Sequence, residues 1–168
     1  APAAPPPRAT APVDLPVELP ADATPGARPE GRPGSVVLPL SRTTLVRGFE
    51  EPTARWGPGH RGVDLAAPVG TAVLSPADGV VVVATRVVDR DVVTVRHDDG
   101  LRSSLEPVLP DLAVGTVVAA GAVVGHVSTG GHCVGCLHWG VREGDVYVDP
   151  LALLDVEREV RLLPVGDR

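Results

Sequence analysis

The sequence predicts an all-β fold in which small antiparallel sheets form a sandwich, and three observations lead to this prediction. Short apolar runs alternate with Gly, Pro and Asp after residue 35, as strands alternate with turns. Aromatic residues make up only 2% of the chain, so the core must be aliphatic, and the β-branched Val that dominates it favours strands. No segment carries a long helical period.

The composition divides the chain into three segments. Residues 1–35 are rich in Pro and Ala, and because Pro lacks the backbone N–H of a sheet ladder, we expect an extended linker outside the core. Residues 36–155 carry the strand pattern and form the expected β domain. Residues 156–168 form a C-terminal tail, which is either a last strand or a frayed end.

The apolar runs define the expected strands in order along the chain. They are Val36–Leu40, Ala72–Leu74, Gly79–Ala84, Val92–Arg96, Leu101–Leu105, Val117–Ala120, Val123–Val127 and Cys136–Arg142. Asp98-Asp99-Gly100 separates two of these runs and predicts a hairpin turn. The segment Leu151 to Leu154, after Asp149-Pro150, resembles a single helical turn.

Charge and composition exclude some classes of function. The formal net charge is -6 and every basic residue is Arg, so the chain lacks the basic footprint of a nucleic-acid-binding protein. No apolar run approaches the length of a membrane span, so we expect no membrane-spanning segment in this chain. The chain begins with Ala and contains no Met, from which we expect a processed or truncated product.

Three side chains have the chemistry of a ligand set for one metal ion. His60 and Asp64 lie four residues apart, and His138 follows much later in the chain. Catalytic zinc is typically held by three N or O side chains and keeps a fourth position for water. A fully extended chain would place the Cα atoms of His60 and Asp64 roughly 13 Å apart, so we expect a bend near Gly62. The alternative is that His60 and Asp64 form a solvated surface pair.

The residues around these candidates resemble a known family. The matching runs are Gly59-His60-Arg61-Gly62-Val63-Asp64-Leu65-Ala66-Ala67-Pro68-Val69-Gly70-Thr71, Ala77-Asp78-Gly79-Val80-Val81, Val93-Thr94-Val95-Arg96-His97-Asp98-Asp99-Gly100 and Leu137-His138-Trp139, with Gly115, Gly121 and Gly125 before the last. From Phe49 to Leu154 the chain closely resembles the lysostaphin-type, or LytM-type, zinc metallopeptidases of peptidase family M23. The resemblance implies a duplicated-hybrid-motif β fold with a groove that binds peptides of bacterial peptidoglycan.

The same resemblance implies a zinc site and a reaction. The family's H-x-x-x-D motif falls on His60 and Asp64, and the second His of its H-x-H motif falls on His138. Zinc held there acidifies a bound water and polarises the scissile carbonyl, which gives amide hydrolysis without a covalent intermediate. The expected protein is an exported zinc metalloendopeptidase, secreted or in the cell envelope, that hydrolyses peptide bonds of peptidoglycan.

Two positions depart from the family's pattern. Cys136 stands where the family has the first His of H-x-H, and Pro107 stands where the family has a further His in a T-x-x-Y-x-H pattern. Loss of one such proton-transfer or oxyanion group commonly lowers the rate by about a hundredfold or more. His132 and Glu106 are the candidate catalytic replacements. The alternatives are that His132 is an exposed loop residue and that Glu106 faces away from the site.

The two cysteines are too few for a four-Cys zinc site. In an exported chain we expect Cys133 and Cys136 to form a short disulfide that stiffens the loop presenting His138. A rival interpretation is that a reduced Cys136 thiolate fills the fourth zinc position and makes the site closed and non-catalytic.

Two further classes of function share features with this sequence. The departures at Pro107 and Cys136 favour, as an alternative, a catalytically degenerate homologue that binds peptidoglycan or regulates a cell-wall hydrolase. A lipoyl- or biotinyl-like carrier domain has a Gly-Val pattern similar to Val114 to Gly125, but a carrier needs an acceptor Lys and this chain has none. His97, which precedes the hairpin turn, is interpreted as structural.

Overall fold

The computed structural model describes residues 35–54 and 57–154, so the expected linker, apart from Ser35, and the expected C-terminal tail lie outside the described residues. The described part is almost entirely strand, which confirms the all-β prediction. Its elements are β1 (Leu45–Arg47), β2 (Val63–Ala66), β3 (Ala72–Leu74), β4 (Gly79–Val87), β5 (Arg90–His97), β6 (Leu101–Glu106), β7 (Val108–Pro110), β8 (Val117–Val118), β9 (Val123–Val127), β10 (Cys136–Glu143), β11 (Val146–Val148) and the 3-10 helix η1 (Pro150–Leu153).

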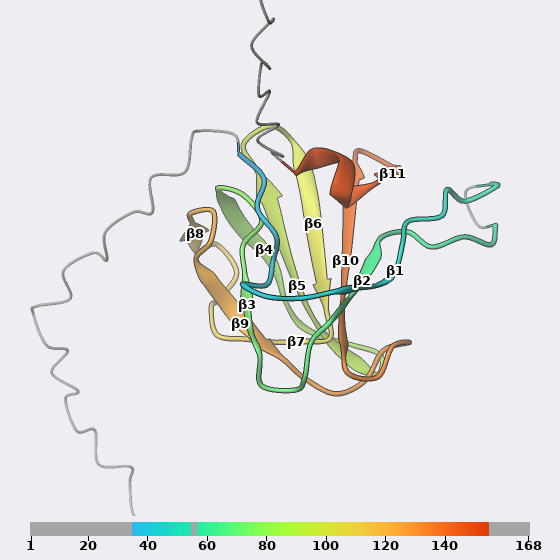
Figure 1. Ribbon diagram of the computed structural model, residues 1–168. Coiled ribbons are helices and arrows are strands. Elements are labelled where there is room, and N and C mark those ends of the chain that lie inside the picture. The colour runs from blue at the N-terminus through green and yellow to red at the C-terminus, as the bar shows by residue number, and fades with distance from the viewer. Residues whose placement is uncertain (1–34, 55–56, 155–168) are drawn as a thin grey trace, which may run out of the picture.

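The strands form two antiparallel sheets. The larger has the order β1-β2-β10-β6-β5-β4-β8, with β11 also paired to β10, and the smaller has the order β3-β9-β7. Figure 1 shows the long strands β4, β5, β6 and β10 side by side, with the smaller sheet beside them. Because β10 pairs with both β2 and β6, it brings the end of the chain into the middle of the larger sheet.

The core lies on one face of the larger sheet and is shared with the smaller sheet. Along β10, Leu137, Trp139 and Val141 are buried and belong to a single apolar cluster that also contains residues of β3 and β9. Side chains alternate between the two faces of a strand, so His138 and Gly140 lie on the face away from this cluster. The candidate ligand His138 therefore lies on the open face of the sheet.

One expected strand is wrong. Val36–Leu40 does not pair as a strand, and only an isolated bridge links Val36 to Leu154. Pro39 has no backbone N–H, so the segment cannot continue a ladder. Its apolar character serves the core instead, because the side chain of Leu40 is 2% exposed.

The structure confirms the other predicted elements, although some of them begin or end at different residues. The strands expected at Ala72–Leu74 and Val123–Val127 have the bounds of β3 and β9, the hairpin turn joins β5 to β6, and the helical turn is η1. The run from Gly79 extends further than expected, to Val87, and the run from Val117 stops at Val118. Four short strands were not expected, namely β1, β2, β7 and β11. Within the described residues, no helix is long and apolar enough to cross a lipid bilayer.

Gly62 allows β10 to pass close to the turn before β2. The backbone bends at Arg61 and Gly62, which confirms the bend expected there. A Cβ atom on Gly62 would lie 2.8 Å from both Gly140 Cα and His138 Cε1, and it would also collide with the carbonyl oxygen of Trp139. Only glycine fits at this position, and the close approach sets where the His138 ring lies.

His97 lies in a closed hydrogen-bond chain inside the core. Its Nδ1 donates to the carbonyl of Asp78 at 3.0 Å, so its Nε2 accepts from the hydroxyl of Ser103 at 2.8 Å. Ser103 Oγ in turn accepts from Trp139 Nε1 at 3.3 Å. Burial lowers the pKa of His97 and outweighs the opposing effect of the Asp78 carbonyl. The ring is therefore neutral at neutral pH, in agreement with a structural role.

We expect the free energy of unfolding to fall as the pH is lowered from 7 to 5, in part because of His97. The lowered pKa means that the unfolded chain binds the proton more readily than the folded chain. The contribution of His97 is complete above about pH 6.5, its unfolded value, and is lost as the pH falls through the folded value. Denaturant titrations across this range should show a shallower pH slope in His97→Asn, by up to about 1.4 kcal/mol per pH unit. An unchanged slope in His97→Asn would contradict this expectation.

Gly62→Ala should lower the free energy of unfolding by about 1–3 kcal/mol, because the new methyl group must displace the backbone of β10. Gly48→Ala is the matched control, since a Cβ atom there meets nothing within 4 Å, and it should change stability by less than about 0.5 kcal/mol. Denaturant unfolding of both variants tests the expectation. Equal stability of the two variants would show that the approach of β10 at Gly62 is not constrained.

Candidate metal centre

His60 is held at the end of the turn that precedes β2. Its Nδ1 lies 2.6 Å from the carbonyl oxygen of Gly48, which can only accept, so Nδ1 carries the proton and donates. The other nitrogen, Nε2, then has a free lone pair and points toward Asp64, with 3.2 Å between His60 Nε2 and Asp64 Oδ1. The backbone carbonyl of Gly48 thus orients His60 as a ligand, and no sequence pattern predicts this contact.

Asp64 and His138 are direct neighbours across two paired strands. Asp64 is in β2, His138 is in β10, and the antiparallel register sets the two residues opposite each other. Directly opposed residues share a face of the sheet, and His138 Nδ1 lies 2.8 Å from Asp64 Oδ1. His60 Nε2 lies 3.2 Å from His138 Nδ1, which closes a triangle of ligand atoms. The structure therefore brings together the three side chains that the sequence suggested.

His132 joins this group from the loop between β9 and β10. Its Nε2 lies 3.0 Å from Asp64 Oδ1 and 3.2 Å from Oδ2. Its side chain is 46% exposed, so the ring is both open to solvent and in contact with the buried carboxylate. The loop turns through Gly131 and Gly135, whose φ angles of 74° and 71° favour glycine. A disulfide between Cys133 and Cys136 closes the loop directly after His132.

The four side chains form one compact group of possible metal ligands. One ligand atom from each of His60, Asp64, His132 and His138 lies within 4.8 Å of the others. Asp64 is 2% exposed and His60 is 5% exposed, so the group is buried on one side and opens to solvent at His132. Cys136 does not belong to the group, because its sulfur is bonded to Cys133 in this structure.

The electrostatics of the group favour a carboxylate surrounded by imidazoles. Burial by itself would raise the pKa of Asp64, but the hydrogen bond with His138 and the nearby His132 and His60 rings lower it below its usual range. Burial lowers the pKa of His138, against the opposing effect of its bond to Asp64. At neutral pH the group therefore contains an ionised carboxylate and a largely neutral His138, as metal binding requires.

Glu106 lies beside the group without joining it. The β6–β10 register sets Glu106 opposite His138, so the two residues share a face of the sheet. Glu106 Oε2 lies 2.9 Å from Arg90 Nε, in the geometry of an ion pair and not of a linear hydrogen bond. A narrow gap beside the group, too small to hold a water molecule, is lined by Glu106, Pro107, Gly131, His132, Cys133, Cys136 and His138. Glu106 therefore does not face away, but Arg90 engages its carboxylate.

Comparison with known proteins agrees with this geometry. The sequence profile of peptidase family M23 matches residues 58–150, which include His60, Asp64, His132 and His138. The chain is 40% identical over 129 residues to the uncharacterized protein Rv2891 of Mycobacterium tuberculosis (strain ATCC 25618 / H37Rv). The match covers 73% of this chain and 51% of Rv2891, so the chain spans about half the length of the curated relatives it matches.

Two solved structures share the fold. Lysostaphin from Staphylococcus simulans superimposes with a TM-score of 0.62 and 21% identity, over 82% of this chain and 61% of lysostaphin. A chain of the SpoIIQ–SpoIIIAH pore-forming complex superimposes with a TM-score of 0.60 and 23% identity, over 73% of this chain and 92% of the other. With the profile match and the 40% identity to Rv2891, these likenesses lead to one conclusion: the chain belongs to peptidase family M23.

Proposed function

We propose that this protein is an exported zinc metalloendopeptidase that hydrolyses peptide bonds of bacterial peptidoglycan. The observation that carries the proposal is the convergence of three imidazoles and one carboxylate at a partly buried site within the region matched by the peptidase family. A surface pair of His60 and Asp64 would not require burial of both side chains to 5% and 2% exposure.

The donor atoms suit zinc. Imidazole nitrogens and one carboxylate oxygen are typical of catalytic zinc sites, whereas magnesium and calcium prefer sites made of oxygen atoms alone. The lone pair of His60 Nε2 faces the carboxylate of Asp64, and a cation shared between them removes this repulsion. His60, Asp64 and His138 are the proposed ligands. When bound there, zinc supplies Lewis-acid polarisation of the scissile carbonyl and a water of lowered pKa.

The protein's own groups orient this site. The Gly48 carbonyl fixes the ring of His60 through Nδ1, and such a second partner sets the tautomer and direction of a ligand histidine. Asp64 supplies the negative charge of the site from a buried strand position. Gly62 keeps the His138 ring where it can face Asp64.

His132 is the proposed proton-transfer residue. It is the most exposed of the four side chains, and its Nε2 lies at hydrogen-bond distance from the carboxylate of Asp64. From this position it can take up a proton next to the metal group and release it to solvent. It can thereby replace the two partner histidines that the family has at the positions of Pro107 and Cys136. The ion pair with Arg90 makes Glu106 the weaker candidate, and we assign it the role of placing negative charge near His138.

The proposed location outside the cytoplasm is supported by the disulfide of Cys133 and Cys136, since such bonds persist in oxidising compartments. The proposed partners are the peptides of bacterial peptidoglycan, by analogy with the lysostaphin-type enzymes that the chain resembles. The disulfide also restrains the segment that carries His132.

A second candidate function is a degenerate, peptidoglycan-binding or hydrolase-regulating module. The observation that favours it is the presence of Pro107 and Cys136 at the two family positions for partner histidines. The same fold occurs in a chain of the SpoIIQ–SpoIIIAH pore-forming complex, so the fold by itself does not establish peptide hydrolysis. The two candidates differ in whether the zinc-loaded protein cleaves peptides.

His60→Ala and His138→Ala should each abolish stoichiometric zinc binding, because each removes one of three ligands. The loss of a supporting group around a zinc site already costs about 10–100-fold in affinity, so loss of a ligand should cost more. Metal analysis of the purified, dialysed proteins measures this. His126→Ala is the matched control, since the half-buried His126 is paired with Asp111 outside the group, and it should keep full zinc. Full occupancy in both ligand variants would refute the assignment.

Digestion of purified peptidoglycan, followed by mass spectrometry of new peptide termini, tests the activity. We expect cleavage by the wild type that a zinc chelator suppresses. His132→Ala should retain zinc but lower the rate by about a hundredfold or more, whereas Glu106→Gln should have a smaller effect. Absence of cleavage by folded, zinc-loaded wild type would favour the binding or regulatory module. Loss of zinc from His132→Ala would instead identify His132 as a fourth ligand.

A further inference from the structure

The open face of the larger sheet extends well beyond the metal group. Along β10, His138, Gly140 and Arg142 alternate with the buried residues and share this face. At about 3.3 Å per residue, Arg142 lies roughly 13 Å from His138 along the strand. The surface between them belongs to the same sheet, so a ligand at the metal group can continue across it.

Three arginines stand side by side on this face. The β6–β10 register sets Arg102 opposite Arg142, and the β5–β6 register sets Arg96 opposite Arg102. Directly opposed residues point to the same side of a sheet, so the three side chains form a row across three neighbouring strands. Arg96 and Arg102 are exposed and Arg142 is half-buried. This arginine row, made of Arg96, Arg102 and Arg142, is parallel to the row that carries the metal group.

The row has no ion-pair partner among the described residues. Arg47, Arg86 and Arg90 each form an ion pair, whereas no carboxylate of the described residues lies within 4.0 Å of Arg96, Arg102 or Arg142. Like charges directly opposite each other in a sheet are destabilising. Three such charges meet on one face of a chain whose net charge is -6, so the row concentrates positive charge where the fold itself gains nothing from it.

No bulky side chain projects from the surface between the metal group and the arginine row. This surface is formed by small side chains, with Gly140 opposite Ser104 and Ser104 opposite Thr94. Thr94 Oγ1 and Ser104 Oγ are hydrogen-bonded to each other at 3.2 Å, so they do not project a long side chain over this floor. An extended peptide can therefore lie across it without steric obstruction.

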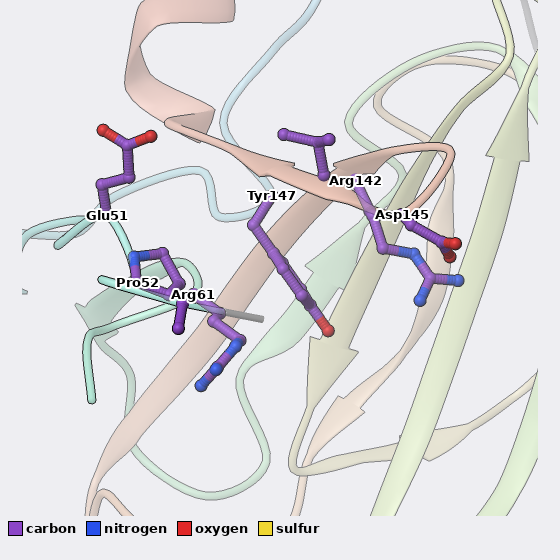
Figure 2. Close-up of a pocket in the computed structure, with 8 residues that line it drawn as sticks. Glu51, Pro52, Arg61, Arg142, Asp145 and Tyr147 are labelled. Atoms are coloured by element: carbon purple, nitrogen blue, oxygen red, sulfur yellow. The ribbon is translucent and has the colours of Figure 1, made fainter. Parts of the chain in front are cut away.

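A pocket continues the surface at the Arg142 end of the row. It has a volume of about 690 Å³ and is lined by Glu51, Pro52, Ala54, Arg61, Arg142, Asp145, Val146 and Tyr147. Arg142 and Tyr147 are opposed across β10 and β11, so both side chains lie on the open face. Figure 2 shows them side by side, with Asp145 next to Arg142. The pocket thus contains carboxylates of its own, whereas Arg96 and Arg102 lie outside it.

We propose that the arginine row binds carboxylate groups of the peptide whose scissile bond lies at the metal group, and so selects acidic peptides. The inference rests on the proposed function for the identity of the reacting site. A guanidinium recognises a carboxylate through charge-assisted and often bidentate hydrogen bonds. In an extended peptide the bound carboxylate lies about four residues from the scissile bond, since each residue spans about 3.3 Å.

Binding of peptide stems released from peptidoglycan tests this inference. The full chain is titrated by calorimetry at low salt with the stems and with the same stems after their carboxyl groups have been converted to amides. We expect the amidated stems to bind at least about tenfold more weakly than the free stems, which is the usual effect of one charged hydrogen bond. Arg102→Gln should weaken binding of the free stems by a similar factor. Arg86→Gln removes the same charge from the opposite face of β4 and should leave the affinity unchanged.

The outcomes separate this inference from the proposed function. The inference is overturned if free and amidated stems bind equally well, or if the wild type binds no stems. It is also overturned if Arg102→Gln and Arg86→Gln lose the same affinity for the stems. Tighter binding of inorganic phosphate than of the stems would overturn the assignment to peptide carboxylates. Mass spectrometry of the recovered stems and of digested peptidoglycan reports cleavage independently. Binding that depends on Arg102 without any cleavage would refute the peptidase and support a carboxylate-binding row.

Discussion

The antiparallel register of β2 and β10 sets Asp64 directly opposite His138, and the candidate site depends on this alignment. A shift by one residue would turn His138 into the core and Trp139 onto the open face, because neighbouring residues of a strand point to opposite sides. The burial of Leu137, Trp139 and Val141 therefore fixes the position of His138 as well. Core formation and ligand placement are two results of the same pairing.

Burying a carboxylate is costly unless other groups compensate for its charge, and the fold surrounds Asp64 with three imidazoles from three separate segments. His60 comes from the turn before β2, His138 from β10, and His132 from the loop before β10. The disulfide next to His132 reduces the freedom of the most exposed of these segments. The site is thus rigid on its buried side and open on the side from which a peptide would approach.

One face of the larger sheet contains both the candidate metal group and the arginine row. Small side chains between them keep the surface low, and the β5–β6–β10 pairing sets the spacing. In the proposed function, the metal group hydrolyses the amide bond, and the arginine row on the same face of the sheet selects the peptide. Substitutions in the metal group should therefore affect the proposed hydrolysis, whereas substitutions in the arginine row should affect the proposed selection of acidic peptides.

The sequence by itself indicated the all-β class and the position of most strands, because these follow from local periodicity. Its short family motifs also pointed to the trio His60, Asp64 and His138, which the structure places together. It also showed that Arg96 and Arg102 flank the Asp98-Asp99-Gly100 turn, from which their opposition across a hairpin could have been inferred. Only the tertiary structure decided that His132 contacts Asp64 and that Arg90 engages Glu106, since both depend on the path of a loop or the pairing of distant strands. The same holds for Arg142, which joins the arginine row only because β10 pairs with β6, and no local pattern encodes that pairing.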